Sequence, residues 1–154
     1  ITNLYLGGSW LPLNEPKSLH DLGITHIVNV ASELVSIEQY KDLFTYFVLS
    51  IEDTNISLAK LQDKFNKIHN FIEEGMKKGK VFVHCNGGIS RSATIVISYL
   101  MGKLNYSLHD AFMTVKNARE SIQPNLYLIK VLIEYDLLLT KKSSFILENY
   151  MDQM

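Results

Sequence analysis

Short apolar runs alternate along the chain with longer stretches in which apolar and polar positions are mixed. Two of these runs, Ile24–Val30 and Phe47–Ile51, are rich in β-branched or aromatic residues and predict buried strands. A third run, Val81–His84, has the same character. Leu4–Leu6 predicts an edge strand, which ends at a pair of glycines.

Between the strands, the apolar positions recur at helical spacing. From about Ser57 to Met76 they lie three or four residues apart, which predicts one long amphipathic helix ended by Gly79. Residues 92–104 are apolar nearly all round and predict a central, well-buried helix. Further helices are predicted, with approximate bounds, over residues 16–22, 107–118, 124–139 and 143–151. Strand–helix alternation of this kind predicts an α/β sandwich with a sheet covered on both faces.

The domain organisation follows from what the chain lacks. Its 154 residues contain no internal repeat, low-complexity stretch or linker, so we expect a single domain over residues 1–154. The role of residues 140–154 stays open. Because the first residue is Ile1 rather than methionine, the sequence also leaves open whether further domains precede it.

Composition and charge limit the partners and the cellular location that we expect. A net charge of −1 gives no reason to expect nucleic acid or an acidic membrane as partner. The single cysteine cannot form an internal disulfide, which suits a reducing compartment. We expect neither a membrane span nor a secretory leader, since no apolar run is long enough for a bilayer. We therefore expect a cytoplasmic protein, with the nucleus left open as a second location, and assume a monomer.

The one cysteine lies in the stretch "VHCNGGISRS", residues 83–92. This stretch joins a predicted central strand to a predicted helix, at the strand end where α/β sheets bind their ligands. Gly87 and Gly88 let the backbone turn tightly, so that its N–H groups and the helix N-terminus can bind an anion. Arg91 adds a planar fork that can hold two oxygens. The stretch therefore predicts a site for a tetrahedral oxyanion, with phosphate as the first candidate.

Cys85 begins this turn and shares its positive field, which favours the thiolate. A thiolate below a bound phosphate monoester can attack phosphorus and form a phosphocysteine intermediate. Ser92 could stabilise that thiolate when it leaves in a second step, and His84 could fix the loop by bonding a backbone carbonyl. We expect no cofactor and no metal, because adjacent His84 and Cys85 would point apart on a strand and the chain has no second cysteine.

His84, Cys85, the five residues that follow and Arg91-Ser92 resemble the loop of the cysteine-dependent protein phosphatases. Other segments resemble the dual-specificity branch of that superfamily: "NLYLGG", "LGITHIVNVASE", "SIEDTN", "YSLHDAFMTVKNAR" and "QPN". The resemblance covers about residues 3–139. It implies a central, mostly parallel sheet of about five strands, flanked by helices on both faces. It also implies that a phosphate-binding loop is formed by Asn86, Gly87, Gly88, Ile89, Ser90 and Arg91, with Cys85, Arg91 and Ser92 as catalytic residues.

The chain departs from the pattern of this branch in two places. Gly87 stands where the branch usually has alanine, which should loosen the loop without disabling it. "LYL" at residues 126–128 replaces the usual glycine-phenylalanine after Pro124-Asn125. We therefore expect contacts below the loop to differ from those of the family.

Cleavage of a phosphate ester also requires a proton for the leaving oxygen. Asp53 is the best placed carboxylic acid, because it follows the strand Phe47–Ile51 at the sheet edge expected to carry Cys85. The resemblance points to the same residue, and Glu52 is its nearest rival. The same carboxylate would act as base for water in the second step.

The expected substrate is a phosphorylated protein, because the loop residues 86–90 contain no lysine, whereas lipid-phosphate members of the family commonly carry basic residues there. Ser92-Ala93 and the short chain favour a shallow pocket that accepts phosphotyrosine, phosphoserine and phosphothreonine. Two alternatives stay open. One is a catalytically silent domain that binds phosphoproteins. The other is a phosphatase for a non-protein substrate, such as an RNA 5′ end, a phosphoinositide or a glucan.

Overall fold

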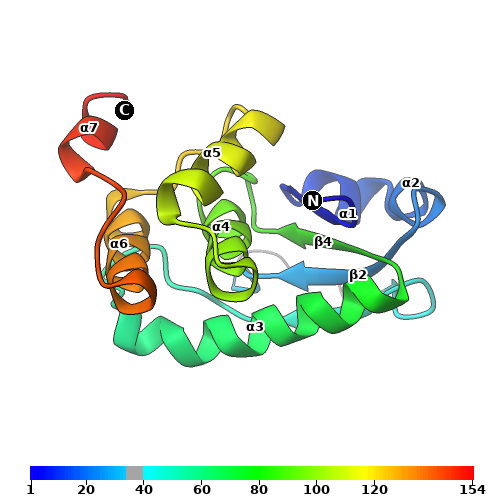
Figure 1. Cartoon of the computed structure of the whole chain (residues 1–154). Helices are drawn as coiled ribbons and strands as arrows, with labels where there is room; N and C mark the ends of the chain where they lie inside the picture. The colour runs from blue at the N-terminus through cyan, green and yellow to red at the C-terminus, as the bar shows by residue number, and fades with distance from the viewer. Residues whose placement is uncertain (34–39) are drawn as a thin grey trace.

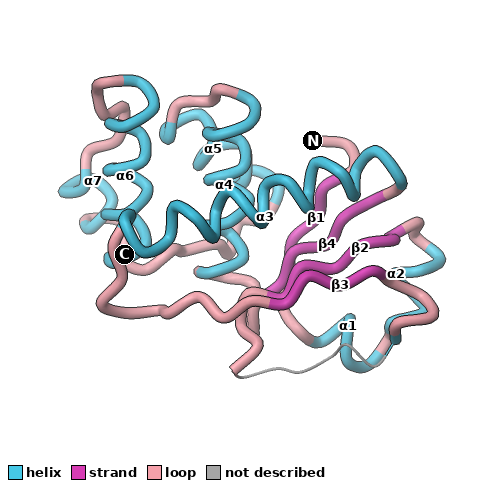
Figure 2. The backbone as a smooth tube through the Cα atoms, turned by 90° about the horizontal axis from the view of Figure 1, so that it is seen from below, coloured by secondary structure: helices cyan, strands magenta, loops and turns pink. Residues whose placement is uncertain are grey.

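The computed structural model describes residues 1–33 and 40–154. Within these ranges, the chain forms one sheet of four parallel strands in the order β1-β4-β2-β3. The strands are β1 (Leu4–Gly7), β2 (Ile24–Asn29), β3 (Thr45–Val48) and β4 (Lys80–His84). Figure 2 shows them side by side, with β1 and β3 at the edges. The expected edge strand is confirmed, and the described sheet has four strands where about five were expected.

The described helices match the predicted ones to within a few residues, with one addition. They are α1 (Trp10–Asn14), α2 (Pro16–Asp21), α3 (Leu58–Lys78), α4 (Arg91–Leu104), α5 (Leu108–Ala118), α6 (Leu126–Thr140) and α7 (Leu147–Met151). The sequence did not predict α1. Its five residues are little more than one turn, which is too short to display helical periodicity.

Helices cover both faces of the sheet, as the sequence predicted. Figure 1 shows α3 along one face, with α1 and α2 on the opposite side. Alternate residues of β4 point to opposite faces of the sheet, because successive side chains of a strand point in opposite directions. Val81 and Val83 belong to the large core that α3, α4, α5 and α6 complete. Phe82 belongs to a smaller core with Leu19 of α2 and Ile24 of β2.

The carboxyl ends of three strands meet at one point. His84, the last residue of β4, is in register with Gly7 of β1 and Asn29 of β2. The chain continues this contact beyond β2, since the N–H of Val30 donates to the His84 carbonyl at 3.0 Å. The segments that follow β1, β2 and β4 therefore emerge together at the edge of the sheet that carries Cys85.

The central helix α4 is buried from Arg91 to Met101, which confirms the prediction from its apolar composition. Burial on this scale fixes the helix against the sheet, and with it the loop from which it starts. Within the described ranges, none of the helices combines the length and the apolar character that a bilayer crossing requires.

Candidate active site

Residues 85–90 form the turn between β4 and α4, and Gly88 gives this turn its shape. Its φ of +72° lies in the left-handed region that favours glycine. A Cβ at this position would lie 2.5 Å from the carbonyl carbon of Gly7 and 2.5 Å from the nitrogen of Gly8. The turn therefore packs backbone to backbone against the end of β1, and side chains are excluded from this contact.

The sulfur of Cys85 has two hydrogen-bond partners. The Gly88 N–H donates to Sγ at 3.3 Å, and the protonated thiol donates to the Ser92 hydroxyl at 3.3 Å. Burial raises the pKa of the Cys85 thiol. Hydrogen bonds from the Ser92 hydroxyl and from the amides of Ser92, Gly88 and Ile89 outweigh that effect, so the pKa lies below its ordinary value. The arrangement favours a thiolate, which is the nucleophilic form of cysteine.

Three carbonyl groups of the turn accept hydrogen bonds from residues that lie outside it. The Asn86 carbonyl accepts from the Ser9 N–H at 2.9 Å, the Gly88 carbonyl from Arg119 Nε at 2.9 Å, and the Ile89 carbonyl from the Gln123 N–H at 2.8 Å. The described peptide bonds are all trans. The N–H of each of these three planar peptide groups therefore points opposite to its carbonyl, toward the inside of the turn. Such inward amides form a concave site for an anion.

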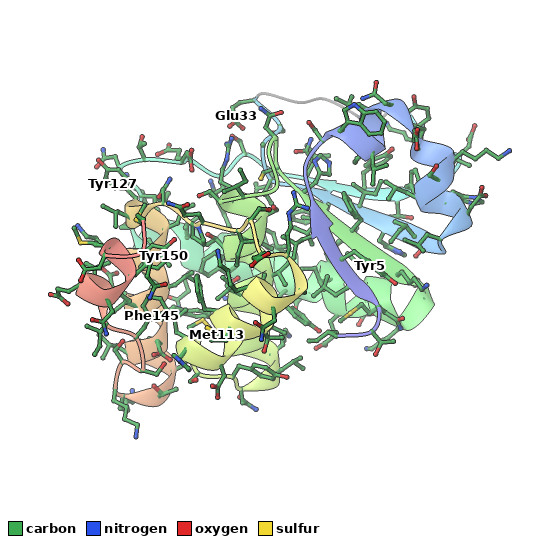
Figure 3. The ribbon with its side chains drawn as sticks, turned by 90° about the horizontal axis from the view of Figure 1, so that it is seen from above. Tyr5, Glu33, Met113, Tyr127, Phe145 and Tyr150 are labelled. Atoms are coloured by element: carbon green, nitrogen blue, oxygen red, sulfur yellow. The ribbon has the colours of Figure 1, made fainter. Side chains whose placement is uncertain are left out.

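Arg91 begins α4 beside this turn, and its side chain is buried. Its guanidinium forms an ion pair with Glu33, and its Nη1 also donates to the Ile51 carbonyl at 3.2 Å. Figure 3 shows Glu33 next to this loop. The second carboxylate oxygen of Glu33 accepts from the Ser50 hydroxyl. Partial burial raises the pKa of Glu33, but the hydrogen bonds from Ser50 and Arg91 outweigh it and hold the pKa below its ordinary value.

His84 is fully buried directly before the turn. Its Nδ1 lies 2.9 Å from the Cys85 carbonyl, so this nitrogen carries the proton and donates. Burial lowers the pKa of His84 despite that hydrogen bond, which keeps the ring neutral. The other nitrogen, Nε2, is buried and has no hydrogen-bond partner among the described residues.

Asp53 is exposed, and Asn125 connects it to the turn. The Asn125 side-chain amide donates to the carbonyl of Asp53 at 2.6 Å and to its Oδ1 at 2.7 Å. The backbone N–H of Asn125 donates to the Ser90 hydroxyl at 3.1 Å. Asp53 and the turn of residues 85–90 are thus held by the same residue at the start of α6. Glu52, the rival carboxylate, is also exposed.

Sequence reasoning selected the residues of the turn and overlooked those that support it from outside. Glu33, Ser9 and Arg119 each reach the turn or Arg91 from other segments of the chain. For Glu33 a signal existed, since it follows the carboxyl end of β2 just as Asp53 follows that of β3. For Ser9 and Arg119 the sequence carries no comparable signal. Arg119 donates to backbone carbonyls, and the Ser9 hydroxyl contacts both the carbonyl and the side-chain oxygen of Asn86.

Comparisons with known proteins agree with this geometry. Residues 4–137 match the family model described as "Dual specificity phosphatase, catalytic domain". A probable dual specificity protein phosphatase of Dictyostelium discoideum is 41% identical over 138 residues, which are 89% of this chain and 33% of that protein. A second one from the same organism is 36% identical over 146 residues, which are 95% of this chain and 66% of that protein.

The solved structures include human tyrosine phosphatase-like serine/threonine/tyrosine-interacting protein. It matches with a TM-score of 0.76 and 33% identity, over 90% of this chain and 93% of that one. The chain spans about a third of the first curated relative and about two thirds of the second. On the match to the family model and on these identities, the chain belongs to the dual specificity phosphatase family.

Proposed function

We propose that this chain hydrolyses phosphate monoesters on phosphotyrosine and on phosphoserine or phosphothreonine of proteins, through a phosphocysteine intermediate. The observation that carries the proposal is the convergence on one sulfur. The Gly88 amide and the Ser92 hydroxyl each lie 3.3 Å from Cys85 Sγ, at the base of a turn whose amides point inward. An unreactive core thiol needs neither partner.

In the first step, the inward amides of the turn and the Arg91 guanidinium hold the non-bridging oxygens of the phosphate. The Cys85 thiolate attacks phosphorus and forms an S–P bond, and the bond from phosphorus to the ester oxygen breaks. The electron pair of that bond goes to the leaving oxygen, which takes a proton from Asp53. The products are the dephosphorylated side chain and a phosphocysteine.

In the second step, a water molecule attacks phosphorus and gives a proton to Asp53. The S–P bond breaks and returns its electron pair to sulfur. The Ser92 hydroxyl, already 3.3 Å from Sγ, donates a hydrogen bond to the thiolate as it forms. Inorganic phosphate is released, and both Cys85 and Asp53 regain their starting protonation states.

The lack of lysine in residues 86–90 and the exposure of the Ile89 side chain support a protein substrate. An exposed apolar residue on the rim of the turn suits a peptide on either side of the phosphorylated residue. The amides and Arg91 would bind the phosphate group alike on tyrosine, serine or threonine.

A second candidate function is a domain that binds phosphoproteins without turnover. It is kept because one structural neighbour is described as a phosphatase-like interacting protein. In this chain, Cys85 and Arg91 are both present, which favours the enzyme. A phosphatase for a non-protein substrate is the remaining alternative.

The test compares the intact chain with its Cys85→Ser variant on phosphotyrosyl and phosphothreonyl peptides, a phosphoinositide, a 5′-phosphorylated RNA and a phosphorylated glucan. We expect release of phosphate from both peptides, at a rate that Cys85→Ser abolishes. Turnover no faster than that of Cys85→Ser, together with retained peptide binding, would replace the enzyme with the binding domain. Faster turnover of a non-protein substrate would replace the proposed substrate class.

A further inference from the structure

The segment after α6 returns to pack on α5 and α6. Asp136 of α6 is buried, and its Oδ2 accepts hydrogen bonds from the N–H of Ser144 at 2.8 Å and from its hydroxyl at 3.0 Å. Its Oδ1 accepts from the Leu108 N–H, at the start of α5, at 3.2 Å. One carboxylate therefore ties the returning segment to both helices.

Three aromatic rings complete this docking. The ring centroids of Phe112, Phe145 and Tyr150 are 5.4 to 5.8 Å apart in each pair, mainly in edge-to-face or tilted arrangements. Figure 3 shows Phe145 and Tyr150 together beside α5, on the side of the molecule away from the sheet. Aromatic pairs at these distances stabilise a packed surface beyond the area they bury. The position of Tyr150 is thus determined by its ring.

The hydroxyl of Tyr150 points out of this cluster toward the start of α6. It donates to the carbonyl of Pro124, and both residues are buried. Burial raises the pKa of Tyr150 to about 12, so the hydroxyl keeps its proton and remains a donor at neutral pH.

The acceptor belongs to a peptide group that the turn also uses. The Pro124 carbonyl and the Asn125 N–H are two ends of the same planar unit, and they point in opposite directions. Tyr150 bonds the oxygen, while the N–H donates to the Ser90 hydroxyl at 3.1 Å. Fixing the oxygen therefore fixes the direction in which the N–H meets the turn.

The side chain of Asn125 is positioned by the same unit. Its oxygen caps α6 by accepting from the Leu128 N–H at 3.0 Å, and its nitrogen donates to Asp53. A rotation of the Pro124–Asn125 peptide would move both the cap and the donor to Asp53. Such a rotation would therefore also displace Asp53, the residue that the proposed mechanism uses as acid and base.

We propose that Tyr150 is a positioning residue: by holding the Pro124–Asn125 peptide, it positions the Asn125 side chain and, through it, Asp53. The inference rests on the proposed function, because it uses the assigned role of Asp53. It gives residues 140–154, whose role the sequence left open, a task in catalysis. It also gives a reason for the packing of the segment after α6 against α5 and α6.

The first test uses hydrogen exchange of the Asn125 and Gln123 amides in the intact chain and in Tyr150→Phe. The substitution keeps the ring and its packing and removes only the hydroxyl. We expect exchange at Asn125 to accelerate on the order of fivefold, the loss of about one hydrogen bond. The matched control is Tyr135→Phe, which removes a buried hydroxyl from α6 at a site packed against Phe65. Exchange at Asn125 should not change in this control.

The second test measures kcat and KM for two aryl phosphates, one with a poor and one with an activated leaving group. For Tyr150→Phe we expect kcat to fall on the order of fivefold with the poor leaving group, which needs a proton, and to stay unchanged with the activated one. KM should not change with either. In an Asp53→Asn background, Tyr150→Phe should cost nothing further, because both changes act on the same proton transfer.

The two tests separate the inference from the function on which it rests. Unchanged exchange at Asn125 in Tyr150→Phe overturns the positioning role, whatever the kinetics. Accelerated exchange with an equal fall in kcat for both leaving groups also overturns it, since the effect would then be a general loss of structure. If Asp53→Asn retains full activity on the poor leaving group, the assigned acid is wrong, whereas accelerated exchange would still support the hold of Tyr150 on the peptide.

Discussion

Glu33 and Arg91 form an ion pair beside the turn of residues 85–90, although they are far apart in the sequence. Within the described residues, the guanidinium makes two hydrogen bonds. Its Nη1 donates both of them, one to the Glu33 carboxylate and one to the Ile51 carbonyl. In the proposed reaction, the remaining N–H groups of the fork would bind two oxygens of one phosphate. Glu33 orients the fork and does not compete for the donors that phosphate would use.

This relationship predicts the effect of Glu33→Gln. The substitution removes the charge that orients Arg91, while the side chain keeps its length. Because Glu33 is partly exposed, we expect a loss of about 1 kcal/mol in transition-state binding, or about fivefold in kcat/KM. Steady-state kinetics on an aryl phosphate measures this loss. Arg91→Lys should be far more damaging, because an ammonium cannot clamp two oxygens.

The matched control is Glu134→Gln, the same substitution at an exposed position on α6. Its kcat/KM should equal that of the unmodified chain. A rise in kcat/KM for Glu33→Gln would show that Glu33 competes with phosphate, and would contradict the orienting role.

The lowered pKa of Cys85 predicts its reactivity. A thiol whose pKa lies below the ordinary value of about 8.5 is ionised to a greater extent at any given pH, so the midpoint of its alkylation profile with iodoacetate should lie below that of an ordinary cysteine. The rate should fall only when the pH drops through the lowered pKa. Ser92→Ala removes one donor to the thiolate and should move the midpoint of this profile upward. A midpoint near 8.5 in the intact chain would mean that the donors around Sγ do not act as described.

The two glycines of the turn should respond differently to alanine. At Gly88, a Cβ would meet backbone atoms at 2.5 Å in a left-handed conformation that alone costs about 1–2 kcal/mol. We expect Gly88→Ala to abolish turnover and to lower the free energy of unfolding. At Gly87, a Cβ would meet only the Ile89 side chain, at 3.8 Å, so Gly87→Ala should leave activity and stability nearly unchanged. Activity assays and urea unfolding of both variants test this contrast. A greater loss of activity or stability in Gly87→Ala than in Gly88→Ala would contradict it.

His69 predicts how stability depends on pH. It is buried in the core, its Nε2 lies 2.8 Å from the Ser98 hydroxyl, and burial lowers its pKa to about 4. The unfolded chain binds a proton at this histidine below pH of about 6.5, while the folded protein does not. Stability should therefore fall as the pH drops from 6.5 toward 4, by up to about 3 kcal/mol from this residue.

Urea unfolding at several pH values between 7 and 4 measures this dependence. In His69→Gln, the fall in stability over that window should be smaller, even though the variant starts from a lower stability at pH 7. His109→Gln, at an exposed position, serves as the control and should keep the full pH dependence. An undiminished fall in His69→Gln would assign the effect to other groups.

The sequence predicted the elements with strong periodicity well. The long helix α3 and the buried helix α4 were located to within two residues, because an apolar stripe or an apolar surface marks each of them. The strand β3 runs over Thr45–Val48, whereas Phe47–Ile51 was expected. The Leu49 N–H still bonds the carbonyl of Asn29, the last residue of β2, and the Ile51 N–H bonds that of Val30, so the end of this strand differs mainly in the regularity of its pairing.

The turn of residues 85–90 could be singled out as a candidate phosphate site because its residues are contiguous and each type has a distinct chemistry. The contacts of Arg119 and Tyr150 could not be predicted, since both side chains donate to backbone carbonyls. Any residue offers such an acceptor, so the pairing leaves no trace in the residue types. Tertiary structure alone brings these donors to the turn.

The central claim is that Cys85 carries the phosphoryl group, and it is tested most directly by trapping that intermediate. The chain is mixed with a phosphotyrosyl peptide, quenched in acid during turnover, digested and examined by mass spectrometry. Our account predicts one added phosphoryl group on the peptide that contains Cys85, and none in the Cys85→Ser variant. Turnover with no phosphorylated Cys85 peptide, or with the phosphoryl group on another residue, would contradict it.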